Sequence, residues 1–117
     1  MAGFTVGADR VDCRAWICFS PESVTASANM TGVRDSFNVS SVVDHGTGMY
    51  TINLTNDMGD TNYAAVMAGG RDSSNQSSLS QPEGSYARAA GTIRVHNTYN
   101  NDNLEDPNIA CVAIFGN

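Results

Sequence analysis

Lysine is absent from this chain of 117 residues, and all six of its basic residues are arginines. The formal net charge is −6 at pH 7, and no two arginines are adjacent. A protein that binds nucleic acid needs a basic patch that replaces phosphate counterions, and a protein that binds an anionic membrane surface needs a similar cluster. The charge balance therefore argues against both kinds of partner.

Long apolar runs are also missing. No stretch approaches the roughly 20 apolar residues that a membrane-spanning helix needs, and the first residues lack the basic and apolar regions of a signal peptide. We expect that the chain does not insert into a membrane. We also expect that it is made in the cytoplasm.

Cysteine is scarce, with only Cys13, Cys18 and Cys111. If residues 13–18 form one strand, Cys13 and Cys18 lie on opposite faces about 16 Å apart and cannot pair. Cys18 and Cys111 could meet in space. The preferred interpretation is three buried, reduced thiols that act as small hydrophobic residues, which implies folding in a reducing cytoplasm.

The residues that are abundant favour strands and turns. Asn, Asp, Ser, Thr and Gly dominate the polar part of the chain, and these residues disfavour helices. Hydrophobic residues make up 41% of the sequence, enough for the core of a single domain. We therefore expect an all-β domain over residues 13–117, preceded by a lead-in or junction segment over residues 1–12.

A hairpin over residues 34–55 is the clearest structural signal. Its arms, 34–43 and 48–55, are rich in Val, Ile, Thr, Phe and Tyr, and a His45-Gly46-Thr47-Gly48 turn separates them. Further strands are expected near residues 14–19, 62–68, 89–96 and 108–115, with a possible short strand near 24–28 and a turn over 56–61. About six strands then form an antiparallel meander or sandwich.

Two of the expected strands, 63–68 and 109–115, are apolar on both faces. An antiparallel sheet in a small monomer normally leaves one face in water. Burial against a second sheet of the same subunit and burial against another subunit both remain open.

Five segments in order resemble the C-terminal tail-fibre modules of tailed bacteriophages. They are Arg14-Ala15-Trp16-Ile17-Cys18-Phe19, Phe37-Asn38-Val39-Ser40-Ser41-Val42, Gly46-Thr47-Gly48-Met49-Tyr50-Thr51-Ile52-Asn53-Leu54, Met58-Gly59-Asp60-Thr61-Asn62-Tyr63-Ala64 and Val112-Ala113-Ile114-Phe115-Gly116-Asn117. The match covers about 100 residues, although Gly59 replaces a usual proline or alanine. The resemblance implies an antiparallel β-sandwich similar to H-type lectins, assembled as a homotrimer. It also implies a place in the virion tail fibre, contacts with other virion tail proteins, and attachment to a host cell-surface glycan or protein.

The sequence offers no convincing catalytic or metal site. Asp44-His45 lacks a presented nucleophile, and no pair of carboxylates stands out for acid–base work on sugars. The cysteines and histidines do not have zinc-ligand spacing. The turns 57–62 and 102–106 carry oxygen ligands suited to calcium but fit no spaced calcium loop, and His96 is expected to be a polar strand-end residue. We therefore expect no catalytic residue, no metal and no cofactor.

The long polar loops 70–82 and 97–107 are the candidate binding surface. Loops of this length in a compact domain usually have a role, although merely solvated loops are the simpler alternative. Trp16 is expected to be a core anchor. The candidate ligand-binding residues are Arg71, Asp72, Asn75, Gln76, Tyr99, Asn100, Asn101 and Asp102.

The expected function is non-catalytic receptor binding by a bacteriophage tail-fibre or fibre-tip component. One alternative is a purely structural virion protein, such as a connector or decoration subunit without a ligand. A second alternative is a small bacterial lectin.

Overall fold

The computed structural model describes residues 4–6, 9–71, 77–82, 88–99 and 103–117, and it describes side chains from residue 12 onward. These residues form ten β-strands and one turn of 3₁₀ helix, Pro21–Ser23. The expected all-β class is confirmed. No helix within the described ranges is long and apolar enough to cross a membrane.

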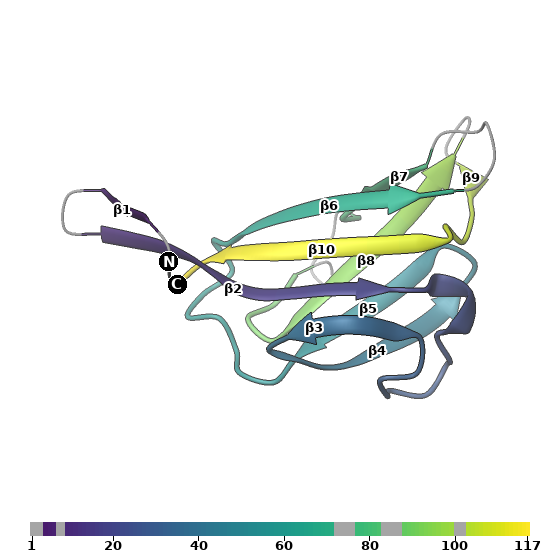
Figure 1. Cartoon of the computed structure of the whole chain (residues 1–117), viewed down its shortest axis with the longest axis horizontal. Coiled ribbons are helices and arrows are strands. Elements are labelled where there is room, and N and C mark those ends of the chain that lie inside the picture. Colours follow the sequence, from purple (N-terminus) through teal and green to yellow (C-terminus); the bar gives the residue numbers. More distant parts are fainter. Residues whose placement is uncertain (1–3, 7–8, 72–76, 83–87, 100–102) are drawn as a thin grey trace.

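Two antiparallel sheets contain all ten strands (Figure 1). The first sheet has the order β1-β2-β10-β6, and β3 also pairs with β2. Its strands are β1 (Phe4–Val6), β2 (Asp9–Phe19), β3 (Val33–Phe37), β6 (Ala64–Gly70) and β10 (Ile109–Gly116). The second sheet has the order β4-β5-β8-β7, and β9 also pairs with β8. Its strands are β4 (Val39–Gly46), β5 (Met49–Leu54), β7 (Ser78–Ser80), β8 (Thr92–Tyr99) and β9 (Asn103–Leu104).

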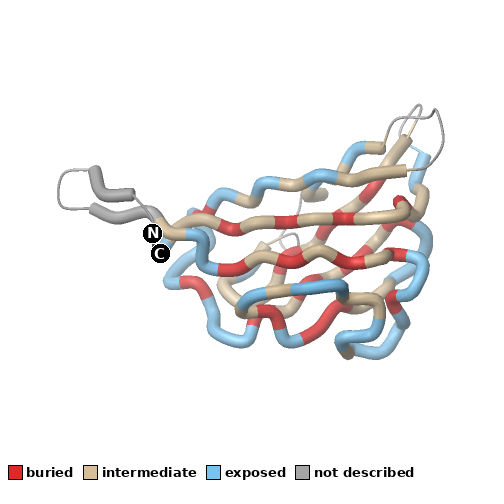
Figure 2. The backbone as a smooth tube through the Cα atoms, in the orientation of Figure 1, coloured by how far each residue is buried: buried red, intermediate tan, exposed pale blue. Residues whose placement is uncertain are grey.

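The core draws buried residues from both sheets, and Figure 2 shows buried positions recurring along the strands. Alternation along β5 and β8 places every second residue inside, as strand geometry requires. Phe19 of the first sheet meets Tyr50 of the second edge to face, with ring centroids 5.5 Å apart. Both residues are fully buried. This pair joins the layers directly.

Asn38 divides the expected first arm of the hairpin into two strands. The backbone φ of Asn38 is +59°, in the left-handed region that asparagine tolerates better than most residues. The chain turns here and passes from β3 in the first sheet to β4 in the second. The prediction of one strand over 34–43 was therefore wrong.

The other five expected strands each overlap one observed strand, namely β2, β5, β6, β8 or β10. The turn after His45 is present, with positive φ at Gly46 and Gly48. The possible strand near 24–28 is absent, and only an isolated bridge between Asn29 and Val42 lies close to it. The expected loops contain the short strands β7 and β9, and the lead-in segment contributes β1 and the start of β2. The short strands β1, β7 and β9, together with the division of the expected strand 34–43 into β3 and β4, account for the difference between about six and ten.

The two apolar strands, β6 and β10, each turn one face toward the core. In β10 the inner residues Ala110, Val112 and Ile114 are buried against the second sheet, while the alternate residues are only half-buried. In β6 the outward Val66 is 60% exposed. The second sheet therefore covers one face of these strands, and none of the described residues covers the other.

The outer face of the first sheet carries a continuous apolar row. Phe37, Trp16, Ala113 and Val66 are cross-strand partners on β3, β2, β10 and β6. Phe37 is 55% exposed and Trp16 is half-buried, so the expectation that Trp16 anchors the core was wrong. Trp16 alternates with the inward residues Ala15 and Ile17, which places it on the outer side.

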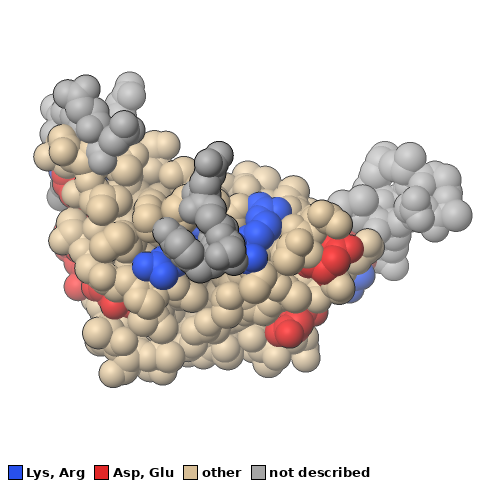
Figure 3. Space-filling view, turned by 180° about the vertical axis from the view of Figure 1, so that it is seen from behind, with Lys and Arg blue, Asp and Glu red and all other residues tan. Residues whose placement is uncertain are grey.

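The outer face of the second sheet is polar by contrast. The outward positions of β5 and β8 include Thr51, Arg94 and His96, and basic atoms lie in the middle of this face (Figure 3). Among the described residues, the two outer faces therefore differ in chemistry, and that of the first sheet is the more apolar.

Candidate functional site

The two candidate loops start from the same end of the molecule, where β6, β7, β8 and β9 meet (Figure 1). Arg71 follows β6, and Tyr99 ends β8. The guanidinium carbon of Arg71 lies 5.1 Å from the centroid of the Tyr99 ring, a distance typical of a cation–π contact. Arg71 also forms an ion pair with Glu105 of the second loop. The structure thus brings together two of the eight predicted site residues. The other six, Asp72, Asn75, Gln76, Asn100, Asn101 and Asp102, lie outside the described residues.

Asn97, near the end of β8, connects the two loops through hydrogen bonds of its side chain. It is fully buried, and each part of its amide has a partner. Its Nδ2 donates to the carbonyl oxygen of Glu105 at 2.8 Å, and its Oδ1 accepts from the hydroxyl of Ser77 at 2.8 Å. Its backbone N–H donates to the carbonyl of Gly48 at 2.8 Å. Since buried polar groups are costly unless paired, this network fixes the second loop, the segment before β7 and the hairpin turn relative to one another.

Asp106 holds the same loop to the hairpin. Its Oδ1 accepts hydrogen bonds from the Gly48 backbone N–H at 2.8 Å and from the Tyr50 hydroxyl. Burial, together with the hydrogen bond to the Asp106 carboxylate, raises the pKa of Tyr50 well above its ordinary value. The tyrosine therefore remains a neutral donor at physiological pH. Sequence reasoning missed Asn97 and Asp106 because each looked like one more polar loop residue.

The chemistry available at this loop end is recognition through hydrogen bonds. Arg71 Nη1 is buried and has no hydrogen-bond partner in the described part of the chain. The side chains of Arg71 and Glu105 remain 14% and 26% exposed. A guanidinium, a carboxylate and a tyrosine ring side by side offer donors, acceptors and an apolar platform, as the binding of a sugar or a polar peptide requires.

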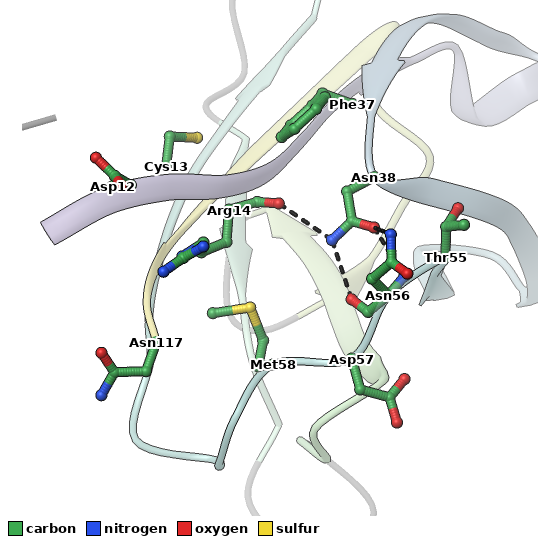
Figure 4. A pocket seen from close by; sticks show the side chains of 10 residues that line it. All are labelled: Asp12, Cys13, Arg14, Phe37, Asn38, Thr55, Asn56, Asp57, Met58 and Asn117. Carbon is green, nitrogen blue, oxygen red and sulfur yellow. Dashed lines mark hydrogen bonds between the residues drawn. The ribbon is translucent and has the colours of Figure 1, made fainter. Parts of the chain in front are cut away.

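A cleft of about 690 Å³ lies at the opposite end of the molecule, near the C-terminus (Figure 4). Side chains from β2, from the corner between β3 and β4, and from residues 55–58 surround it together with Asn117. The lining residues are Asp12, Cys13, Arg14, Phe37, Asn38, Thr55, Asn56, Asp57, Met58 and Asn117.

Asn38 builds one wall of this cleft. Its Nδ2 donates to the carbonyl oxygens of Arg14 at 3.1 Å and Asn56 at 3.0 Å, and its Oδ1 accepts from the Asn56 backbone N–H at 2.8 Å. Arg14 in turn donates from Nε to the carbonyl of Gly116 at 3.2 Å. The cleft was not predicted. Its only sequence signal was an asparagine between two strand-like runs, which is a common turn residue.

The surroundings of the two histidines lower the pKa of both rings. His45 Nε2 lies 2.7 Å from the hydroxyl oxygen of Thr51. Burial and, next, the positive charge of Arg94 lower the pKa of His45. His96 is half-buried on β8, where burial and Arg94 also lower its pKa. Both rings are therefore mainly neutral at pH 7, and no serine or cysteine is hydrogen-bonded to either within the described ranges.

The acidic turns do not form a metal centre in the described residues, where no group of three or more metal-ligating side chains comes together. Asp60 accepts a hydrogen bond from the backbone N–H of Asn62 at 2.8 Å, which closes a local turn. Glu105 forms an ion pair with Arg71, and Asp106 accepts a hydrogen bond from the Tyr50 hydroxyl.

Comparison with protein-family models, with curated proteins and with solved structures gives no match for this chain.

Proposed function

We propose that this chain is a non-catalytic host-surface binding component of a bacteriophage tail fibre or fibre tip. In this proposal the chain folds as a β-sandwich similar to H-type lectins and assembles as a homotrimer. It sits in the virion beside other tail proteins and binds a host glycan or protein. The five ordered motifs support the family, and the two antiparallel sheets are compatible with the sandwich.

The observation that carries the binding role is the contact of Arg71 with both Tyr99 and Glu105. These contacts join two loops that are far apart in the sequence into one surface. In a trimer, three copies of this surface would point in one direction, so that weak contacts add through avidity.

A structural role without a ligand is the second candidate. The exposed apolar row on the first sheet favours it, because a soluble protein rarely leaves such a row uncovered. A connector or decoration subunit would use this row against a neighbouring virion protein. A small bacterial lectin is the third candidate and would share the loop chemistry.

A cell-binding assay with loop variants tests the proposal. The purified chain, labelled with a fluorophore, is incubated with a panel of bacterial strains and measured by flow cytometry. Arg71→Ala and Tyr99→Ala are expected to lower binding to a responsive strain about tenfold or more, as the loss of a central contact does. Arg34→Ala is the matched control, because Arg34 is an exposed arginine on β3 with one side-chain hydrogen bond, to Ser20.

Light scattering on the same samples gives the solution mass. A stable mass of three chains together with a loss of binding in the loop variants supports the receptor-binding trimer. A trimer that binds no strain supports the structural role. A monomer that binds sugars through the same loops supports the lectin.

A further inference from the structure

Cys18 and Cys111 lie directly opposite each other at the centre of the first sheet. They are register partners in the antiparallel pair of β2 and β10. Their Sγ atoms are 2.8 Å apart, and Cys18 donates its thiol hydrogen to Cys111. Both residues are half-buried on the outer face, and both are free thiols. The expectation of buried cysteines was therefore wrong for these two, and also for Cys13, which is exposed.

We propose that Cys18 and Cys111 form a redox site that closes to an intrachain disulfide under oxidising conditions. Opposed residues of an antiparallel pair have Cα atoms about 4.5–5.5 Å apart, within the span of about 4.4–6.8 Å that disulfides occupy. The sulfurs must approach from 2.8 Å to about 2.0 Å. Such a shift needs side-chain rotation and no change of register.

The position of the pair gives the bond a large effect on stability. The two cysteines are 93 positions apart in the sequence, so that one bond would link the first long strand to the last. A crosslink that closes a long loop removes much of the conformational freedom of the unfolded chain. It would also hold together the two central strands of the sheet that carries the apolar row.

The pair is open to a small oxidant. A shallow hollow of about 300 Å³ lies over it, lined by apolar side chains that include Trp16, Val66 and Ala68. Burial and, next, the hydrogen bond shared with Cys18 raise the pKa of Cys111 to about 11. Since the thiolate is the attacking species, oxidation should be slow at neutral pH and faster as pH rises.

Oxidised glutathione is the co-reactant that completes the chemistry. One cysteine thiolate attacks a sulfur of the glutathione disulfide and expels a glutathione thiolate. The other cysteine, as its thiolate, then attacks the mixed disulfide and expels the second glutathione. Each cysteine gives its proton to the solvent, a new S–S bond forms, and two reduced glutathione molecules carry away the two electrons.

The test uses the full chain with Cys13→Ser, which removes the exposed third thiol. The reduced protein is incubated with oxidised glutathione at pH 8.5, digested without reductant and analysed by mass spectrometry. We expect one crosslink between the peptides of Cys18 and Cys111, a monomeric product and no glutathione adduct. The melting temperature should rise by roughly 10 °C and return to its starting value with dithiothreitol.

Cys13→Ser/Cys18→Ser and Cys13→Ser/Cys111→Ser are the controls, and neither should show the rise. Free thiols after incubation, glutathione adducts on both cysteines, or crosslinks between chains would each overturn the proposal. The peptide map needs only the Cys13→Ser variant, so poor folding of the control variants would leave the result intact. The redox site does not depend on the proposed tail-fibre function.

Discussion

Asn38 Oδ1 accepts the backbone N–H of Asn56 at 2.8 Å, and this bond closes the corner at which the chain passes between the sheets. The same side chain donates to the carbonyl oxygens of Arg14 and Asn56. One asparagine thus makes the left-handed turn, satisfies three backbone groups and shapes the wall of the cleft (Figure 4).

Asn38→Ala should lower the free energy of unfolding by about 2–4 kcal/mol, because it loses these hydrogen bonds and strains a positive φ. Asn38→Gly should cost about half as much, since glycine adopts that φ freely. Urea denaturation measures both, with Ser40→Ala on the neighbouring strand as the control. If glycine is no milder than alanine, backbone strain at this corner is not significant.

Asn97→Ala should lower the free energy of unfolding by about 2–4 kcal/mol, because it leaves the Ser77 hydroxyl and the Glu105 carbonyl unpaired. It should also loosen the loop end, so that limited proteolysis cuts near residues 99–105 faster. Ser78→Ala, at an exposed position of β7, serves as the control. Equal rates of proteolysis for the wild type, Asn97→Ala and Ser78→Ala would show that Asn97 does not hold the loops.

Tyr50→Phe should remove a stability change at alkaline pH. The folded-state pKa of Tyr50 is raised above its ordinary value of 10.0. The contribution of the neutral Tyr50 side chain to the free energy of unfolding is therefore complete below pH 10.0. It is lost as pH rises above 10.0 toward the folded-state pKa. Urea denaturation from pH 8 to pH 11 should show a steeper fall for wild type than for Tyr50→Phe. Parallel curves would contradict the raised pKa.

Arg94→Gln should raise the pKa of both histidines, because Arg94 lowers each of them electrostatically. Their folded-state pKa values lie below 6.5, so the unfolded chain binds more protons as pH falls through 6.5. The stability from the neutral rings is therefore complete above 6.5 and lost on acidification. Titration by NMR measures both rings directly, and Arg34→Gln should leave them unchanged.

Val66→Glu should abolish any self-association through the apolar row, because it places a charge at the 60% exposed position on β6. Light scattering would show a fall from the assembled mass to the mass of one chain. Ser40→Glu introduces the same charge on the second sheet and should leave the mass unchanged. A stable assembly in both variants would place the subunit contact elsewhere.

Local sequence patterns were sufficient for much of this fold. The Gly46-Thr47-Gly48 turn could be predicted because two glycines supply the positive φ that the turn needs. The apolar residues Tyr50, Ile52 and Leu54 alternate with polar neighbours in the sequence, and this alternation coincides with the buried face of β5. The scarcity of helix-favouring patterns fixed the all-β class, and the loop positions of Arg71 and Tyr99 marked them as binding candidates.

The tertiary structure decided what depends on residues far apart in the chain. One long strand and two consecutive strands in different sheets have similar sequences. Only the strand pairing showed that β3 and β4 belong to different sheets. Pairing of β2 with β10 brought Cys18 to Cys111, and packing of the loops brought Arg71 to Tyr99 and Glu105. Apolar residues on both faces of β6 and β10 predicted a second burial partner, whereas the layer order determined which face the second sheet covers. The sequence encodes local backbone preference at each residue, but contacts across the sheets arise only when many such preferences are satisfied together.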